Sequence, residues 1–174
     1  MTRIAVAAVV ALTGCADREK PGPGTSGEAF PSGSSSSSSS ETASSAGGAT
    51  LEVFAIEPAK DTFTFDTAGV RSVPAGQRLI TFKNLGAMSH EVRVMRINDG
   101  NFTAYQGAVT ASPVGAESLA TEAARSPSVE AGASSTFGAE LSPGTYAVVC
   151  LLNAPDGKAF AQHGMIRALN VSAG

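Results

Sequence analysis

From residue 51 onward, the chain is built of short segments in which apolar and polar side chains alternate. In LEVFAIE (51–57) and DTFTFD (61–66), every second residue falls on the same side of an extended chain. This period of two predicts β-strands with one buried face. The segments predicted as strands are 51–57, 61–66, 77–84, 90–97, 135–141, 145–150 and 165–171.

The punctuation between these segments favours an all-β fold. VPAG (73–76) and SPG (142–144) are turn sequences, and no long amphipathic helix interrupts the strands. We therefore predict an antiparallel β-sandwich. The exception is 113–125, which is rich in Ala and Glu, with Ser112 as N-cap and Pro113 at the first helical position. It predicts one short helix inserted between strands.

Residues 16–50 have a different composition. The segment contains seven consecutive serines and repeated Gly and Pro, with few apolar residues. Such a chain cannot bury enough surface to offset its conformational entropy. We predict a flexible linker with an r.m.s. span of roughly 30–35 Å, leading to a folded domain over 51–174. A glycosylated, mucin-like stalk is the alternative.

The first 15 residues form a candidate export signal. Arg3 precedes a nine-residue apolar run (4–12), which suits a signal-peptide core but is too short to span a bilayer. The run ends in Leu-Thr-Gly-Cys, which resembles the lipobox of bacterial lipoproteins, with Cys15 as the lipidated residue. Two or more acyl chains such as palmitate would hold the protein on a membrane. An ordinary secretory signal with a chance cysteine is the alternative.

This resemblance implies an extracytoplasmic protein, lipid-anchored at the bacterial cell surface or the periplasmic face. After the N-terminus, no run of 18 or more apolar residues predicts a spanning helix. The net charge is −3, the sequence pI is about 5.3, and no nucleic-acid-binding motif is present. We therefore expect no nucleic-acid partner, and we expect a monomer.

The chain has two cysteines, and acylation of Cys15 would leave Cys150 without an intramolecular partner. In an exported protein, such a thiol is buried and inert, paired between molecules, or a metal ligand. Taken alone, Cys150 favours the first possibility, because free cysteine behaves as a small apolar residue.

The motifs that surround Cys150 and His90 bear on which of these three possibilities applies. The segment PAGQRLITFKNLGAMSHEV (74–92) places a turn, a strand, Asn84 and then His90 in order, and LSPGTYAVVC (141–150) is followed by Gly164 and Met165. In these features, the region from 51 to 171 resembles the cupredoxins, the small β-sandwich proteins that carry blue copper. The resemblance implies a Greek-key β-sandwich that binds copper for electron transfer or copper handling, with a redox or copper-trafficking protein as partner.

The resemblance also implies a ligand set. His90 matches the first histidine, Cys150 the thiolate and Met165 the axial ligand, a soft set that copper accepts. The position of the second histidine is occupied by Phe160, and the nearest histidine is His163. If 163–165 continued as a strand, His163 and Met165 would point to the same face. We therefore predict a metal site of His90, Cys150, His163 and Met165.

Three alternatives remain at this point. Each candidate ligand could instead be an ordinary core or loop residue, and the domain would then be a metal-free binding or structural module. Met88 is a further soft donor, and a His, Cys and Met set could hold Cu(I) without electron transfer. A catalytic Cys–His pair, with Asn153 or Asp156 orienting the base, lacks any signature of a cysteine hydrolase around Cys150. We predict that the protein is not an enzyme.

Overall fold

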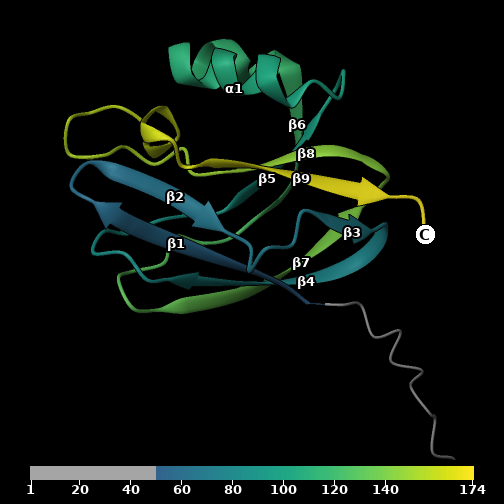
Figure 1. Ribbon diagram of the computed structural model, residues 1–174, viewed down its shortest axis with the longest axis horizontal. Helices are drawn as coiled ribbons and strands as arrows, with labels where there is room; N and C mark the ends of the chain where they lie inside the picture. The colour runs from purple at the N-terminus through teal and green to yellow at the C-terminus, as the bar shows by residue number, and fades with distance from the viewer. Residues whose placement is uncertain (1–49) are drawn as a thin grey trace, which may run out of the picture. The chain divides into compact units, whose positions relative to one another are not determined.

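The computed structural model describes residues 50–174, which fold into two β-sheets (Figure 1). The first sheet has the strand order β2 (Thr62–Asp66), β1 (Leu51–Ala59), β4 (Gly76–Asn84) and β7 (Ser134–Leu141). The second has the order β3 (Ser72–Pro74), β9 (Ile166–Ser172), β8 (Gly144–Val149), β5 (Arg93–Ile97) and β6 (Ala120–Arg125).

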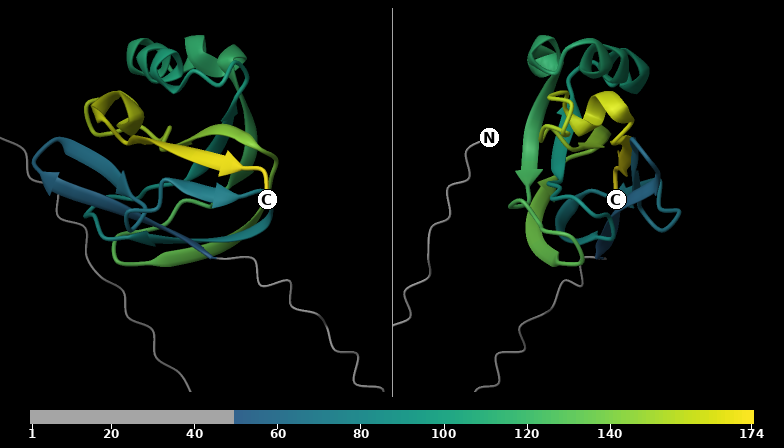
Figure 2. Two further views of the ribbon diagram at one scale, coloured as in Figure 1. Left: turned by 45° about the vertical axis from the view of Figure 1, so that its right-hand side comes forward. Right: turned by 90° about the vertical axis from the view of Figure 1, so that its left-hand side faces the viewer.

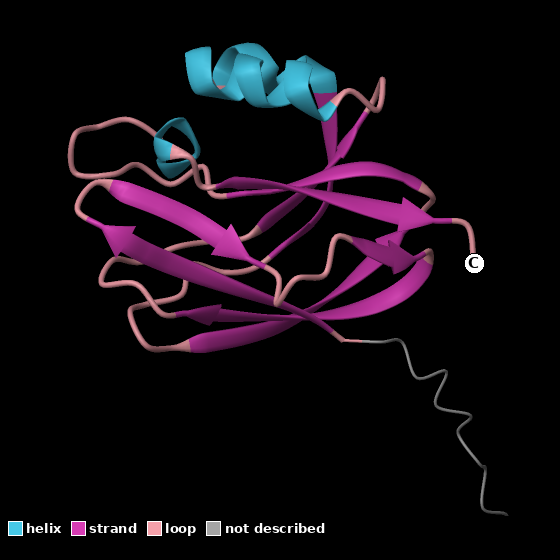
Figure 3. Cartoon of the chain, viewed as in Figure 1, coloured by secondary structure: helices cyan, strands magenta, loops and turns pink. Residues whose placement is uncertain are grey.

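The predicted β-sandwich is confirmed, and strands dominate the described chain (Figure 3). Most neighbouring strands are antiparallel, but β1 pairs with β4 and β3 pairs with β9 in parallel. Alternation of side chains predicts that a segment is a strand but does not say which way its neighbour runs. The sequence pattern therefore could not predict the two parallel pairs.

The main core fills the space between the two sheets, and β8 shows how the sequence places it. Tyr146, Val148 and Cys150 belong to the core cluster shared with β1 and β4. Ala147 and Val149 belong to a second cluster on the opposite face of the same strand. The alternation therefore sets two buried faces, and it directs the side chain of Cys150 into the sandwich.

The second cluster is covered by helix α1 (Phe102–Ala111), which inserts between β5 and β6. Figure 2 shows from two further sides that α1 lies beside the five-stranded sheet, away from the four-stranded one. The side chain of Asn101 caps α1 by accepting a hydrogen bond from the N–H of Ala104 at 3.0 Å. Tyr105 and Val109, four residues apart, form its buried face.

The prediction of a helix over 113–125 was wrong in its position. Only Val114–Leu119 is helical, as the 3₁₀ helix η1, and 120–125 forms strand β6 against β5. Pairing with β5 overrides the helix propensity of the Ala and Glu residues there. Ser112 ends α1, and its hydroxyl accepts a hydrogen bond from the N–H of Gly115 at 3.3 Å. The inserted helix is real, but it lies before Pro113.

The predicted signal peptide (1–15) and nearly all of the predicted linker (16–50), including Cys15, lie outside the described residues. Within residues 50–174, none of the helices has the length and apolar character needed to cross a membrane.

Candidate metal centre

The loop that carries His90 is held by Asn84, the last residue of β4. The buried amide nitrogen of Asn84 donates to the carbonyls of Met88 and Val129 at 2.7 and 2.8 Å. Its side-chain oxygen accepts from the N–H of Gly86 at 2.9 Å. His90 then forms a two-bond bridge with Val129, which fixes the histidine backbone at the end of the sandwich.

Glu57 orients the imidazole of the buried His90. Its carboxylate lies 3.1 Å from Nε2 of His90 and accepts from the N–H of Met88 at 3.1 Å. Partial burial alone would raise the pKa of Glu57, but the backbone N–H groups of Ala87 and Met88 and the contact with His90 hold it below its usual value. The ionised carboxylate draws the proton to Nε2 and leaves the lone pair on Nδ1.

Cys150 follows directly after β8, and its buried Sγ lies 3.9 Å from Nδ1 of His90. Burial raises the pKa of the Cys150 thiol to about 11, although the backbone N–H groups of Glu91 and Leu152 oppose the shift by bonding to the sulfur. Burial likewise lowers the pKa of His90, against the opposing effect of Glu57. At neutral pH the pair is a thiol and a neutral imidazole. A thiol with a raised pKa is a poor nucleophile, which argues against the catalytic Cys–His alternative.

Met165 lies opposite Cys150 at the start of the next strand. The N–H of Cys150 donates to the carbonyl of Met165 at 3.1 Å, next to the pairing of Val149 with Ile166. Residues opposite each other on neighbouring strands share a face, and both side chains are buried in the core between the sheets. The structure therefore brings together His90, Cys150 and Met165.

Phe160 lies beside these residues. It begins the 3₁₀ helix η2 (Phe160–His163), its side chain is 2% exposed, and its ring centroid is 4.4 Å from that of His90. Hydrogen bonds from the N–H groups of Phe160 and Ala161 to the carbonyls of Leu152 and Cys150, both at 2.9 Å, tie the helix to the end of β8. A phenyl ring thus fills space next to the imidazole and offers no lone pair.

His163 is not brought to the other three residues. Its Nε2 lies 3.1 Å from the exposed carboxylate of Asp156, and its side chain is 20% exposed. Residues three apart in a 3₁₀ helix lie on the same side but about 6 Å apart along the axis, so His163 lies one turn beyond Phe160. Within residues 50–174, no three His, Cys, Asp or Glu side chains form a metal-binding group.

The path of the chain explains this placement. The sequence argument assumed that 163–165 continues as a strand, but Gly164 ends η2 with a φ of +99°. A left-handed residue interrupts an extended chain, so strand alternation does not apply here: Met165 is buried in the core, whereas the side chain of His163 is partly exposed. An added Cβ at Gly164 would lie 3.4 Å from the carbonyl of Phe63, and its conformation disfavours any side chain.

Two of the buried donors, His90 and Cys150, lie close enough for one metal ion to bind both. Typical metal–nitrogen and metal–sulfur bonds are about 2.0 and 2.3 Å long. The 3.9 Å between Nδ1 of His90 and Sγ of Cys150 is slightly less than their sum, so one ion can reach both atoms. The thioether of Met165 is a third soft donor, and this set suits Cu(I).

Sequence reasoning missed Glu57 altogether and missed the role of Asn84. Glu57 holds the imidazole, although its segment read only as an alternating strand. Asn84 was noted as part of the motif, but its hydrogen bond to the carbonyl of Val129 depends on a segment 45 residues away in the sequence. The charge of Glu57 within an otherwise apolar strand end was the one available signal.

The architecture agrees with the resemblance found in the sequence, because two sheets form a sandwich and the histidine and cysteine meet at one end. The fold is cupredoxin-like. No protein-family model matches the chain, and no curated protein matches it.

Three solved structures illustrate the similarity. Rusticyanin from Thiobacillus ferrooxidans is 20% identical, over 72% of this chain and 79% of its own, with a TM-score of 0.49. Auracyanin A from Chloroflexus aurantiacus, described as a blue copper protein, is 21% identical over 71% and 98%, with a TM-score of 0.44. Reduced auracyanin from Roseiflexus castenholzii is 22% identical over 71% and 96%, with a TM-score of 0.45.

Proposed function

We propose that the domain is a copper-binding, cupredoxin-like module that holds Cu(I) through Nδ1 of His90, Sγ of Cys150 and Sδ of Met165. The observation that carries the proposal is the buried pair of His90 and Cys150, 3.9 Å apart, with Glu57 on the far nitrogen of the imidazole. A carboxylate on the remote nitrogen of a histidine is the usual support of a metal-binding imidazole.

The donor set favours copper handling over electron transfer. Cu(I) accepts a thiolate, a thioether and one imidazole, whereas a centre that cycles between Cu(I) and Cu(II) uses a second imidazole. Phe160 lies where that second imidazole is expected, and His163 is bonded to Asp156 at the surface. Copper supplies no chemistry to a substrate in this proposal, because the ion itself is the cargo.

Binding requires Cys150 to lose its proton, because the thiolate is the ligand. The N–H groups of Glu91 and Leu152 already bond to the sulfur and would stabilise the negative charge. His90 is neutral at physiological pH and needs no deprotonation. One proton therefore leaves for each Cu(I) that binds.

We further propose that Cys15 is acylated and that the domain works on the outer side of a bacterial membrane, where it exchanges copper with a protein partner. The lipobox-like Leu-Thr-Gly-Cys sequence and the serine-rich segment that follows it support this location. Mass spectrometry of the mature N-terminus tests it. The proposal requires acyl chains on Cys15 and loss of the protein from the membrane fraction in Cys15→Ala.

The copper proposal is tested with the chain from 16 to 174, which contains both described core clusters and has Cys150 as its one thiol. Cu(I) is titrated anaerobically against a chromophoric chelator. We expect one tightly bound Cu(I) per chain. Cys150→Ser should abolish tight binding, and Met165→Leu should weaken it, whereas Met95→Leu, in the other core cluster, is the matched control.

The outcomes separate the functions. Tight binding that persists in Cys150→Ser would overturn the proposed ligand set. An intense visible absorption band with Cu(II), lost in Cys150→Ser, would instead favour an electron carrier, and dependence of that band on His163 would identify His163 as a ligand.

A metal-free binding or structural module is the second candidate. Phe160 favours it, because this ring is buried and packs at 4.4 Å from His90 and 4.7 Å from Phe63, as a core residue does. Failure of the chain to bind either Cu(I) or Cu(II) would select this function.

A further inference from the structure

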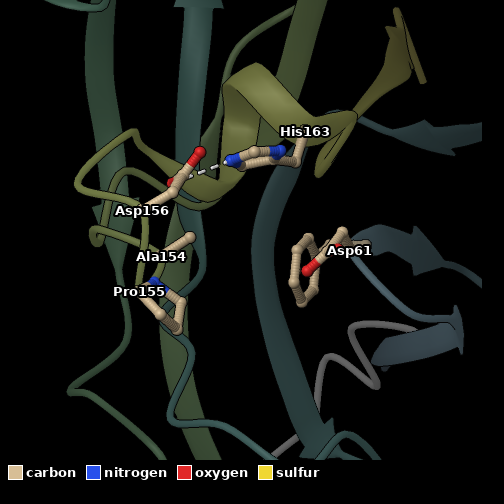
Figure 4. A pocket seen from close by; sticks show the side chains of 6 residues that line it. Asp61, Ala154, Pro155, Asp156 and His163 are labelled. Carbon is tan, nitrogen blue, oxygen red and sulfur yellow. Dashed lines mark hydrogen bonds and ion pairs between the residues drawn. The ribbon is translucent and has the colours of Figure 1, made fainter.

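A surface pocket of about 470 Å³ lies beside the buried donors, and nothing so far assigns it a role. Its lining residues are Asp61, Phe63, Ala154, Pro155, Asp156 and His163. Figure 4 shows His163 and Asp156 joined at one side of the pocket, with Asp61 across from Ala154 and Pro155. Phe63 and Ala154 also belong to the core cluster that contains Cys150, so the pocket and the metal centre share walls.

His163 in this pocket contacts a carboxylate in the same way as the buried His90 does. In both His90 and His163, Nε2 lies 3.1 Å from a carboxylate oxygen, of Glu57 in one case and Asp156 in the other. In each, the carboxylate fixes the proton on Nε2 and leaves the lone pair on Nδ1 for a metal. The carboxylate of Asp156 accepts a hydrogen bond from the backbone N–H of Lys158 and also contacts His163. These two interactions keep the pKa of Asp156 below its usual value.

A continuous row of rings connects the two histidines. The centroid distances are 5.8 Å from His163 to Phe63, 4.7 Å from Phe63 to Phe160 and 4.4 Å from Phe160 to His90. The two phenyl rings therefore stand between the pocket and the buried pair.

The charge of the pocket suits a cation. Asp61 and Asp156 both line it, and the imidazole of His163 adds a nitrogen donor. An acidic concave surface raises the local concentration of positive ions and the rate of their association. His163 with Asp156 offers too few ligands to retain the ion, as expected for a place of passage.

We propose that this pocket is the port through which Cu(I) reaches and leaves the buried site, with Nδ1 of His163 as its first ligand and with Phe63 and Phe160 as the barrier. The inference rests on the proposed function, because it concerns delivery to the same site. As the ion passes inward, its bond to His163 breaks, a bond to Sγ of Cys150 forms, and the thiol proton leaves to water. Copper stays Cu(I) throughout, so no electron donor is needed.

The first test measures the rate of loading. The chain from 16 to 174 is mixed anaerobically with the Cu(I)–bathocuproine complex, and transfer is followed by loss of the complex's colour. We expect His163→Ala to slow transfer on the order of tenfold and to leave the equilibrium affinity unchanged. Asp61→Asn should slow it by a smaller factor that vanishes at high salt, and Glu140→Gln, an exposed carboxylate on β7, is the charge-matched control.

The second test needs no copper. Cys150 is the one cysteine of residues 16–174, so its alkylation in this shortened chain reports on access to the buried site. We expect Phe63→Leu to raise the alkylation rate of the metal-free chain well beyond the change explained by its loss of stability. Phe65→Leu removes an equally buried ring of the same strand that does not line the pocket, and it should show only the stability-linked change.

Each of the two tests has a result that would overturn the proposed port. Equal loading rates for the wild type and His163→Ala would exclude His163 as the first ligand. A loss of equilibrium affinity as large as the loss of rate would make His163 a ligand of the buried site. Equal stability-corrected alkylation in Phe63→Leu and Phe65→Leu would exclude the barrier. Failure of the proposed function is recognised separately, because no variant would then bind Cu(I) at equilibrium.

Discussion

Nδ1 of His90 lies 3.9 Å from Sγ of Cys150, and neither side chain reaches solvent. The sandwich thus places two donors from loops 60 residues apart in the sequence within reach of one ion. Burial sets the chemical state of both donors, a neutral imidazole and a thiol, against the opposing effects of Glu57 on His90 and of two backbone N–H groups on Cys150. A buried thiol with so raised a pKa is inert until a metal replaces its proton.

The first prediction follows from that proton. Since Cys150 is a thiol up to a pKa of about 11 and His90 is already neutral, Cu(I) binding should release one proton. The logarithm of the apparent association constant should rise by about 1 per pH unit from neutral pH to about pH 10. Chelator competition across this range measures the slope. A slope near zero would mean that the thiolate is not a ligand.

The second prediction concerns Phe160. Its ring lies 4.4 Å from that of His90, so Phe160→His would place a second imidazole beside the first. We expect this variant to develop an intense visible thiolate-to-Cu(II) band that the wild type lacks. Phe160→Leu opens similar space without a donor and should stay colourless. A band of equal strength in the wild type would contradict this account of Phe160.

The third prediction concerns stability in acid. Burial lowers the folded-state pKa of His90 below 6.5, so the unfolded chain is protonated first as the pH falls. The free energy of unfolding should therefore decrease from about pH 6.5 downward, by about 1.4 kcal/mol per unit of pKa difference. The lowered pKa of Glu57 adds a further loss below 4.5, as the pH approaches its folded-state pKa.

Denaturant unfolding at a series of pH values, with His90 followed by NMR, measures this dependence. His90→Asn should remove the part of the loss that begins near 6.5, and His163→Ala should retain it. A His90 midpoint at or above 6.5 in the folded chain would contradict the prediction.

The fourth prediction concerns the hydrogen bonds by which Asn84 holds the loop that carries His90. Asn84 is buried and uses its amide in three hydrogen bonds, so Asn84→Ala should lower the free energy of unfolding by about 2–4 kcal/mol. Asn98→Ala, at an exposed residue that donates to Ser118, should cost about 1 kcal/mol or less. Equal losses of unfolding free energy in the two variants would show that the hydrogen bonds of Asn84 do not support the loop.

The sequence predicted most of the sandwich because alternation in segments such as 145–150 reports directly which side chains face the core. It misplaced the inserted helix, since the partner strand β5, rather than local propensity, decides that 120–125 is extended. It paired His163 with Met165 because the left-handed conformation of Gly164 is invisible to a strand pattern. Contacts such as Glu57 with His90 arise only when distant segments meet.

The most direct test of the central claim is X-ray absorption at the copper edge of the Cu(I)-loaded chain from 16 to 174. The proposed site of His90, Cys150 and Met165 predicts two sulfur donors and one nitrogen donor. Met165→Leu should remove one sulfur, and His163→Ala should leave the spectrum unchanged. A centre with two nitrogen donors that loses one in His163→Ala, or a chain that takes up no stoichiometric copper, would contradict the account.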